Sequence, residues 1–383
     1  MRHCPPQNRK CKVTPSNNLI RLYSECGQSP WLDNLKRGYI TSGRLAQVCG
    51  SGIRGLTSNP TIFQKAIQGS NDYDEQLASL LHQNTTATNI YWDLVVHDII
   101  GALDVFASVY ESSNGVDGFV SVEVDPGLAH DTVATQLAAR ELHQRINRPN
   151  VMIKIPATRE GIPAIRTMIG EGRNVNVTLI FSLDRYRQVM EAYIDGLEVL
   201  AANTSGALPA VSSVASFFIS RVDTEVDRRL EAIGSVVAVQ LRGKSAIAQA
   251  KLAYELFQRM FSGPRWDALA KRGARPQRPL WASTSTKNPD YSDTLYVDEL
   301  IGPDTVNTLP DSTVEAFLAR GNVKRTIDTN VDQSHSHWAA LQEIGIDMTD
   351  VATQLEREGV GSFKSSFDEL IAALMTKAAL IIG

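Results

Sequence analysis

The chain has 383 residues, of which 43% are hydrophobic and 21% are charged, and its formal net charge is −4 at pH 7. This composition is typical of a globular protein with a large core, and the small negative charge gives no sign of a nucleic-acid surface. No apolar run approaches the roughly 18 residues that a bilayer crossing needs. We therefore expect neither a nucleic acid nor a membrane as a partner.

The four cysteines lie at one end of the sequence, at Cys4, Cys11, Cys26 and Cys49, and form no C-x-x-C pair. A disulfide framework for so long a chain would not be confined to one end, so we expect a reducing compartment and a cytoplasmic location. Residues 1–28 are expected to form a disordered extension, and residues 29–383 the folded protein. The oligomeric state is left open between monomer and homodimer.

Short runs rich in β-branched residues predict eight strands. In chain order they are Pro30–Leu35, Gly55–Pro60, Phe119–Asp125, Val151–Pro156, Asn176–Phe181, Ala210–Ile219, Leu280–Thr284 and Thr305–Pro310. Helical patterns between them cover residues 88–110, 130–146, 158–169, 183–202 and 245–269, with Ser182 and Asp311 as N-caps and Pro163 in a first turn.

The alternation of strands and helices predicts an α/β fold with parallel strands and right-handed crossovers. Eight such units favour a closed (β/α)8 TIM barrel in a single domain over an open sheet. Additional helices from Trp338 to Ile382 are expected to pack on the outside of the barrel or over one mouth.

Polar residues recur near the carboxyl ends of the predicted strands. They are Asp33, Asn59, Glu123, Lys154, Thr178, Ser216, Ser283 and Asn307. In a barrel these strand ends converge on one face, which is where barrel enzymes carry out their chemistry. We therefore expect a catalytic site at this face.

The stretch VMIKIP places Lys154 among apolar residues. Taken alone, it is explained by an edge strand whose lysine reaches water, or by an ion pair. If Lys154 points into a barrel, loss of solvation should lower its pKa and free the amine as a nucleophile for a ketone or aldehyde. Asp33 and Glu123 are then the acids available for the proton transfers that a Schiff base requires.

Three residues further along the chain suit a phosphate group. Arg221, just past the sixth strand, can pair with a phosphate through two parallel hydrogen bonds. Ser283 and Lys287 follow the seventh strand, where barrels often hold phosphate. The pattern favours a phosphorylated substrate.

Five motifs in order carry a resemblance to a known family. They are GLTSNPTIF (55–63), VSVEVDPGLAHDT (120–132), NVMIKIPAT (150–158), NVNVTLIFS (174–182) and SFFISR (216–221). Together they resemble transaldolase, and the WLDNL start and the LWASTSTKNPDYSDTLY segment are similar to its longer bacterial form. The resemblance runs from about Ser29 to about Leu318. It implies a (β/α)8 barrel that moves a dihydroxyacetone unit between sugar phosphates without a metal or cofactor.

The resemblance also implies roles for the polar residues. Lys154 would form the Schiff base, and Asp33 would handle the proton of the hydroxyl at the carbon–carbon bond that is cleaved. Glu123 and Thr178 would position the water used in carbinolamine dehydration. The implied substrate-binding residues are Asn59, Asn176 and Ser216 for the dihydroxyacetone hydroxyls, Phe218 as a wall, and Arg221 and Ser283 for the phosphate.

Two positions depart from the family pattern. Ser58 stands where many members have threonine, which keeps a hydroxyl beside Asn59. The segment after Ser283 lacks the second phosphate-binding arginine of the shorter forms. We assign that role to Lys287. Its ammonium supplies a positive charge but not the planar pair of N–H donors of a guanidinium, so this departure bears on the affinity for phosphate more than on the reaction.

Three further sequence features resemble functional motifs, but we interpret them as structural. Residues 50–55 match G-x-G-x-x-G but precede a strand instead of following one, so we expect a loop and no dinucleotide. His335 and His337 are expected to lie in a solvated turn, since no third metal ligand is apparent. The basic run Lys271–Arg278 is expected to be a solvated loop.

Two other functions compete with transaldolase activity. A class I aldolase with the same barrel would release dihydroxyacetone or a similar ketone to water. A catalytically silent relative would only bind sugar phosphates, although the presence of Lys154, Asp33 and Glu123 argues against this alternative.

Overall fold

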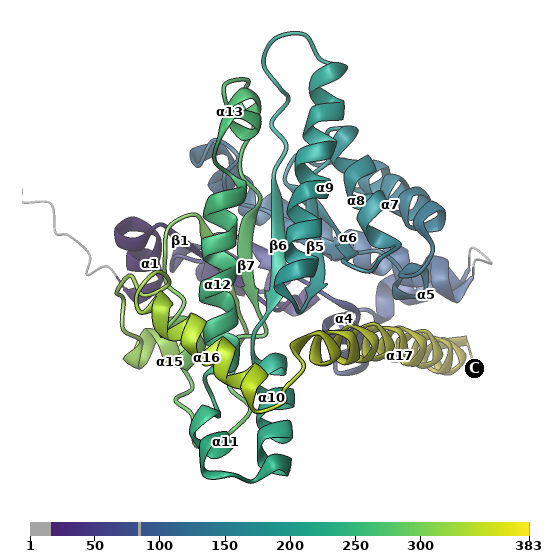
Figure 1. Cartoon of the computed structure of the whole chain (residues 1–383). Helices are drawn as coiled ribbons and strands as arrows, with labels where there is room; N and C mark the ends of the chain where they lie inside the picture. The colour runs from purple at the N-terminus through teal and green to yellow at the C-terminus, as the bar shows by residue number, and fades with distance from the viewer. Residues whose placement is uncertain (1–16, 83–85, 383) are drawn as a thin grey trace, which may run out of the picture.

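The computed structural model describes residues 17–82 and 86–382 of the chain. Within them, eight parallel strands form a closed barrel in which each strand pairs with the next and β8 pairs with β1 (Figure 1). The strands are β1 (Gln28–Leu32), β2 (Leu56–Thr57), β3 (Val120–Glu123), β4 (Val151–Pro156), β5 (Val175–Ile180), β6 (Ser213–Phe218), β7 (Arg278–Ala282) and β8 (Thr305–Leu309). The predicted (β/α)8 barrel is confirmed.

The helices surround this barrel, one or more after each strand (Figure 1). They are α1 (Asn18–Cys26), α2 (Arg37–Thr41), α3 (Arg44–Gly50), α4 (Pro60–Gln68), α5 (Asp74–Leu81), α6 (Ala87–Ser112), the short 3₁₀ turn η1 (Pro126–Leu128), α7 (Thr132–Ile146), α8 (Gly161–Gly170), α9 (Leu183–Ala202), α10 (Ser220–Ile233), α11 (Val236–Leu241), α12 (Ser245–Met260), α13 (Pro264–Ala270), α14 (Leu295–Asp298), α15 (Asp311–Arg320), α16 (Val331–Glu343) and α17 (Met348–Ile382). None of the described helices combines the length and apolar character needed to cross a membrane.

Several strands stop one to three residues short of the predicted ends. Asp33, Asn59 and Ser283 therefore belong to the loops that leave β1, β2 and β7. Asn59 caps α4, with its Oδ1 accepting from the backbone N of Ile62 at 3.0 Å, and Ser283 has a left-handed φ of 58°. The polar residues thus sit on the rim of the barrel, where loop geometry directs their side chains.

Some predicted helix boundaries need correction. The segment 245–269 is two helices, because α12 ends at Met260 and α13 begins at Pro264 after Gly263, whose φ is 86°. Ser182 is confirmed as an N-cap, since its Oγ accepts from the backbone N of Arg185 at 3.1 Å. Asp311 is not a cap but the first residue of α15, where its carboxylate accepts hydrogen bonds from Asn34 in the loop after β1 and from Tyr39 in α2.

The N-terminal segment is partly folded in the structure. Residues 1–16, with Cys4 and Cys11, lie outside the described residues. Helix α1 follows, with Leu19 and Leu22 fully buried, and Gly27 ends it with a φ of 69° before β1. The folded chain therefore begins before residue 29, and Cys26 and Cys49 are free thiols.

The basic run before β7 is not simply a solvated loop. Arg278 points into the amino end of the barrel, is 9% exposed, and lies 3.0 Å from the buried carboxylate of Asp117. Arg272 and Arg275 donate to backbone carbonyls of neighbouring segments, including that of Ala201 at the end of α9 at 2.9 Å. These arginines tie the loops together at the end of the barrel opposite the polar rim.

The two histidines expected in a turn lie within α16. His335 Nε2 is 2.9 Å from the Glu255 carboxylate, and His337 Nε2 is 3.0 Å from Ser245 Oγ. Burial lowers the pKa of His337 to about 4. Both side chains therefore attach α16 to α12, and among the described residues no cluster of metal-binding side chains is found.

The last helix covers one mouth of the barrel. In Figure 1, α17 runs in yellow across the end of the strands where α4 and α10 also lie, and it contacts α4, α10 and β5. Gly359 permits the approach, because a Cβ there would come within 2.9 Å of the Leu179 side chain. The expectation that the C-terminal helices pack over a mouth is confirmed, although α16 begins at Val331, before Trp338.

Candidate active site

A cavity of about 150 Å³ lies at the carboxyl ends of the strands, beneath α17. It brings together residues from seven of the eight strand ends and from α17. Its lining residues are Asp33, Thr57, Asn59, Lys154, Thr178, Ser216, Phe218, Arg221, Ala282, Ser283, Ser285, Lys287, Thr308, Pro310 and Phe363. The predicted convergence of polar residues is therefore present in the fold.

Lys154 points into this cavity from β4 and is 5% exposed. Its Nζ lies 3.5 Å from Glu123 Oε2 and donates to the backbone carbonyl of Ser58 at 3.3 Å. Glu123 is the register partner of Lys154 on β3, so the sheet itself places the two side chains next to each other. The explanation of Lys154 by an exposed edge strand is wrong, because β4 pairs on both sides.

Glu123 is a buried carboxyl with unused hydrogen-bonding capacity. Burial raises its pKa above the ordinary value, while the neighbouring Lys154 cation opposes the shift. Its Oε2 accepts no hydrogen bond within the described chain, and the same holds for the Thr178 hydroxyl on β5. These two buried polar atoms accept no hydrogen bond from the described residues, although Glu123 Oε2 is in ion-pair contact with the Lys154 amine, and they can hold a small polar molecule between them.

A backbone irregularity accompanies Thr178. The register between β5 and β6 shifts between Val177 and Ile180, and Leu179 has a left-handed φ of 59°. Such bulges re-aim side chains at the rim of barrels. Thr178 lines the cavity at this irregularity.

Asp33 is held by a short chain of hydroxyls. Its Oδ1 accepts from Thr57 Oγ1 at 2.7 Å, and Thr57 Oγ1 lies 2.6 Å from Thr308 Oγ1. Burial raises the pKa of Asp33, whereas the Lys154 cation and the Thr57 hydrogen bond lower it. The hydroxyl chain fixes the orientation of the carboxylate toward the cavity.

Asn59 and Ser216 line the cavity, but Asn176 lies behind them. The Asn176 amide is fully buried, donating to Ser121 Oγ at 3.0 Å and accepting from Ser216 Oγ at 2.7 Å. Ser216 therefore stands between Asn176 and the cavity in this structure. Asn176 orients Ser216, and within the described residues one of the two Asn176 amide N–H groups donates no hydrogen bond.

The residues predicted to bind phosphate gather at one end of the cavity. Arg221 in the first turn of α10 lies over the Phe218 ring at 5.4 Å, and Lys287 Nζ donates to Ser285 Oγ at 2.9 Å. Among the described residues, neither cation forms an ion pair with a carboxylate. Burial lowers the pKa of both, and the Arg221 charge lowers that of Lys287 further. Two unpaired cations beside Ser283 suit a dianionic ligand group.

Sequence reasoning missed six lining residues, which are Thr57, Ala282, Ser285, Thr308, Pro310 and Phe363. Thr57, Ser285 and Thr308 are hydroxyls on or beside predicted strands, and the alternation along β8 could have identified Thr308. The prediction of Asn307 at the mouth is wrong, because adjacent strand residues face opposite sides. Asn307 is buried and does not line the cavity, and its amide atoms have no hydrogen-bond partner in the part of the chain that the structure describes. Phe363 comes from α17, with its ring 5.8 Å from Lys154 Nζ, and no local signal placed it there.

Comparison with known proteins gives a consistent result. Residues 30–374 match the family model described as Transaldolase/Fructose-6-phosphate aldolase. The chain is 47% identical to Transaldolase 1 of Streptomyces coelicolor, with 95% of this chain and 96% of the relative covered. It is 51% identical to the transaldolase of a Parafrankia species, over 91% and 95%, and 49% identical to that of Thermobifida fusca, over 92% and 96%.

Proposed function

Because this chain belongs to the transaldolase/fructose-6-phosphate aldolase family, we propose that it is a transaldolase of the pentose phosphate pathway. It moves a dihydroxyacetone unit from sedoheptulose 7-phosphate or fructose 6-phosphate to glyceraldehyde 3-phosphate or erythrose 4-phosphate. The observation that carries the proposal is the Lys154 amine, buried in a barrel mouth beside Glu123 and facing a cavity that Asp33 also lines. The reaction needs no metal or cofactor.

The first step is imine formation at Lys154. Its Nζ, having passed a proton to Glu123, attacks the C2 carbonyl carbon of the donor, and the carbonyl oxygen takes up a proton to give a carbinolamine. Loss of that oxygen as water leaves a protonated imine. The unbonded Oε2 of Glu123 and hydroxyl of Thr178 support a role for this pair in holding the departing water.

The second step breaks the bond between C3 and C4. Asp33 accepts the proton of the C4 hydroxyl, the C3–C4 electron pair moves toward the imine, and an aldose phosphate leaves. The remaining enamine attacks the carbonyl carbon of the acceptor, and Asp33 returns the proton to the new alkoxide. Hydrolysis of the new imine releases the product ketose and restores Lys154.

Binding of the substrate is divided between the two ends of the cavity. We assign the hydroxyls of the dihydroxyacetone unit to Asn59 and Ser216, with Asn176 oriented behind them and Phe218 as a wall. Arg221, Ser283 and Lys287 take the phosphate. The unpaired charges at that end support this assignment, because a phosphate would satisfy both cations.

The test that separates transfer from simple aldol cleavage uses the acceptor. Free dihydroxyacetone is measured from fructose 6-phosphate with and without erythrose 4-phosphate. A transaldolase releases little ketone in either condition and forms sedoheptulose 7-phosphate when the acceptor is present. Substantial release in both conditions would establish the class I aldolase alternative instead, which the shared family description makes the second candidate.

We place the enzyme in the cytoplasm, acting as a monomer or homodimer. The two free thiols at Cys26 and Cys49 support a reducing compartment. We take residues 29–383 as one catalytic unit, with the preceding helix α1 packed onto it. Sedimentation of the purified chain would determine its assembly state.

A further inference from the structure

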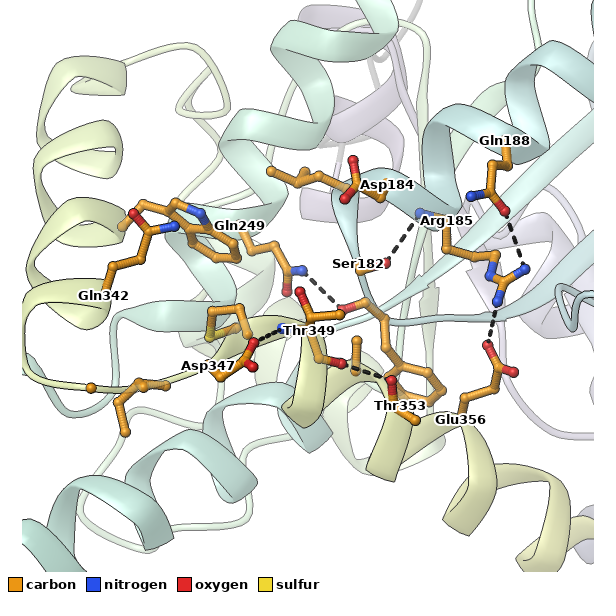
Figure 2. Close-up of a pocket in the computed structure, with 17 residues that line it drawn as sticks. Ser182, Asp184, Arg185, Gln188, Gln249, Gln342, Asp347, Thr349, Thr353 and Glu356 are labelled. Atoms are coloured by element: carbon orange, nitrogen blue, oxygen red, sulfur yellow. Dashed lines mark hydrogen bonds and ion pairs between the residues drawn. The ribbon is translucent and has the colours of Figure 1, made fainter.

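A second and larger cavity, of about 820 Å³, lies outside the barrel. Its walls come from the start of α9, from α12, from α16, from the turn that joins α16 to α17, and from the first turns of α17 (Figure 2). It shares no lining residue with the active-site cavity. The Phe181 side chain lines it, and that ring lies 5.0 Å from the Phe218 ring of the active site, so the two cavities are neighbours separated by aromatic side chains.

Gln249 at the base of this cavity has an unused acceptor. The residue is 1% exposed, and its Nε2 donates to the backbone carbonyl of Phe181 at 2.9 Å, the bond drawn beside the Gln249 label in Figure 2. This bond fixes the orientation of the amide. The Oε1 atom has no hydrogen-bond partner in the described chain, and a buried acceptor left unpaired is costly. A ligand that donates an N–H or O–H would satisfy it.

The charges around the cavity disfavour anions. Asp184, Asp347 and Glu356 line it, and Arg185 is the one cationic residue among its lining side chains. That arginine lies 3.3 Å from the Glu356 carboxylate and is neutralised by it, as Figure 2 shows. Asp184 is likewise paired, with Arg187 outside the lining, so Asp347 leaves the lining with a net negative charge that disfavours a phosphate or carboxylate, in contrast to the cationic end of the active site.

The remaining walls favour a flat or apolar ligand. Trp338 is half-buried on α16, and Phe181, Ile346 and Met348 are buried beside it. Aromatic rings and a polarizable thioether make favourable contacts with the faces and edges of other rings. A volume of this size is within the range of small-molecule sites.

We propose that this cavity binds an uncharged or cationic nitrogen heterocycle that carries an amino group. The amino N–H donates to Gln249 Oε1, and the ring packs among Trp338, Phe181 and Met348. The site is separate from the proposed chemistry at Lys154, so it is a second ligand site of the folded chain. Binding is non-covalent and does not depend on activity.

The experiment uses adenosine as the neutral probe and adenosine 5′-monophosphate as its anionic counterpart. Titration of the full chain is followed by the methyl NMR signal of Met348, assigned with a Met348→Leu variant. The Met348 signal reports on the second cavity, so it is not affected by binding of the nucleotide phosphate at Arg221. Adenosine should shift the Met348 signal saturably and leave Met168 and Met190, buried around the barrel, unmoved. The nucleotide should bind at least about tenfold more weakly because of its charge.

Gln249→Met removes the Oε1 acceptor and keeps a side chain of similar volume. The apparent affinity for adenosine should therefore fall by about tenfold or more. Gln258→Met makes the same change on the exposed face of α12 and should bind adenosine like the wild type. A Met348 signal that adenosine leaves unchanged at millimolar concentration would overturn the proposal. So would equal binding of both probes, or a crystal soaked in adenosine that shows only an ordered water at Gln249 Oε1. The probe comparison and the soak use the wild-type chain, so they decide the matter even if Gln249→Met does not fold.

Discussion

The Nζ atom of Lys154 and the Oε2 atom of Glu123 lie 3.5 Å apart inside the barrel, with side chains only 6% and 4% exposed. Their neighbouring positions on β3 and β4 make this pair a consequence of strand register. Burial of an ion pair is costly, and moving one proton from the amine to the carboxylate leaves both groups neutral. The burial-raised pKa of Glu123 makes it a suitable acceptor for that proton. The fold thus holds the proposed nucleophile and its proposed proton acceptor together.

Glu123→Gln tests the role of this carboxyl. The amide keeps the volume but cannot accept the Lys154 proton or assist the departure of water. We expect kcat to fall by about 10²–10⁴-fold, the usual contribution of a general acid–base group. Steady-state assays measure this, with circular dichroism to show that the variant is folded. A kcat within threefold of the wild type would contradict the assignment.

Thr57→Val tests the hydroxyl that holds Asp33. Because Asp33 must be ionised to accept the C4 proton, activity falls as pH drops through its pKa. The Thr57 hydrogen bond lowers that pKa, so its loss should raise the pKa further and move the acidic limb of the kcat profile toward neutral pH. Thr57→Ser keeps the hydroxyl and should leave the limb in place. A limb that moves to lower pH in the valine variant would refute this role.

Lys287→Gln tests the phosphate site. Removing one of two unpaired cations should raise KM for fructose 6-phosphate by about tenfold, with a smaller effect on kcat because Lys287 lies away from the reacting carbons. KM for unphosphorylated fructose should stay unchanged. Lys324→Gln, at an exposed position remote from the cavity lining, serves as the control. An equal rise in KM for both sugars would show that Lys287 acts on folding or on the sugar ring.

Phe363→Ala tests the cover that α17 places over the cavity. Its ring lies 5.8 Å from Lys154 Nζ and 6.0 Å from the Arg221 guanidinium. Without it, water should reach the enamine or imine more easily, so release of free dihydroxyacetone in the absence of an acceptor should increase. The cost in stability is about 3–5 kcal/mol, as for other buried phenylalanines.

Phe367→Ala is the matched control for the cover. Phe367 lies one turn further along α17, is 7% exposed, and packs against Tyr91 instead of the cavity. It should destabilise the chain to a similar degree without increasing ketone release. If both variants release dihydroxyacetone equally, loosening of α17 as a whole and not the Phe363 ring controls access of water.

The strand count and the position of Lys154 could be predicted from sequence because both depend on local patterns. A β-branched run with an isolated lysine identifies a buried strand, and parallel strands bring their carboxyl ends to one face. At β8 the predicted residue was wrong by one position, because Thr308 and not Asn307 faces the cavity, and the alternation of side chains along the strand was not used to choose between them. The contact of Phe363 with the site joins parts of the chain more than 200 residues apart, which no local pattern specifies.

The break between α12 and α13 was missed because the apolar periodicity was given too much weight. The apolar periodicity of the segment 245–269 continues through Gly263 and Pro264, so a prediction from periodicity alone treats the two helices as one. The pair Gly263-Pro264 should have outweighed that periodicity, because proline is tolerated in the first turn of a helix but not in its interior. Roles of arginines in the basic run were also missed, because their acceptors are carbonyls and the Asp117 carboxylate on other loops.

Borohydride trapping tests the central claim most directly. The chain is incubated with fructose 6-phosphate, reduced with borohydride, digested, and analysed by peptide mass. We predict a reduced dihydroxyacetone adduct on the peptide that contains Lys154, and none in Lys154→Arg, whose guanidinium stays protonated and cannot form the imine. An unmodified Lys154 peptide in the active wild-type enzyme, or an adduct at another lysine, would contradict the account.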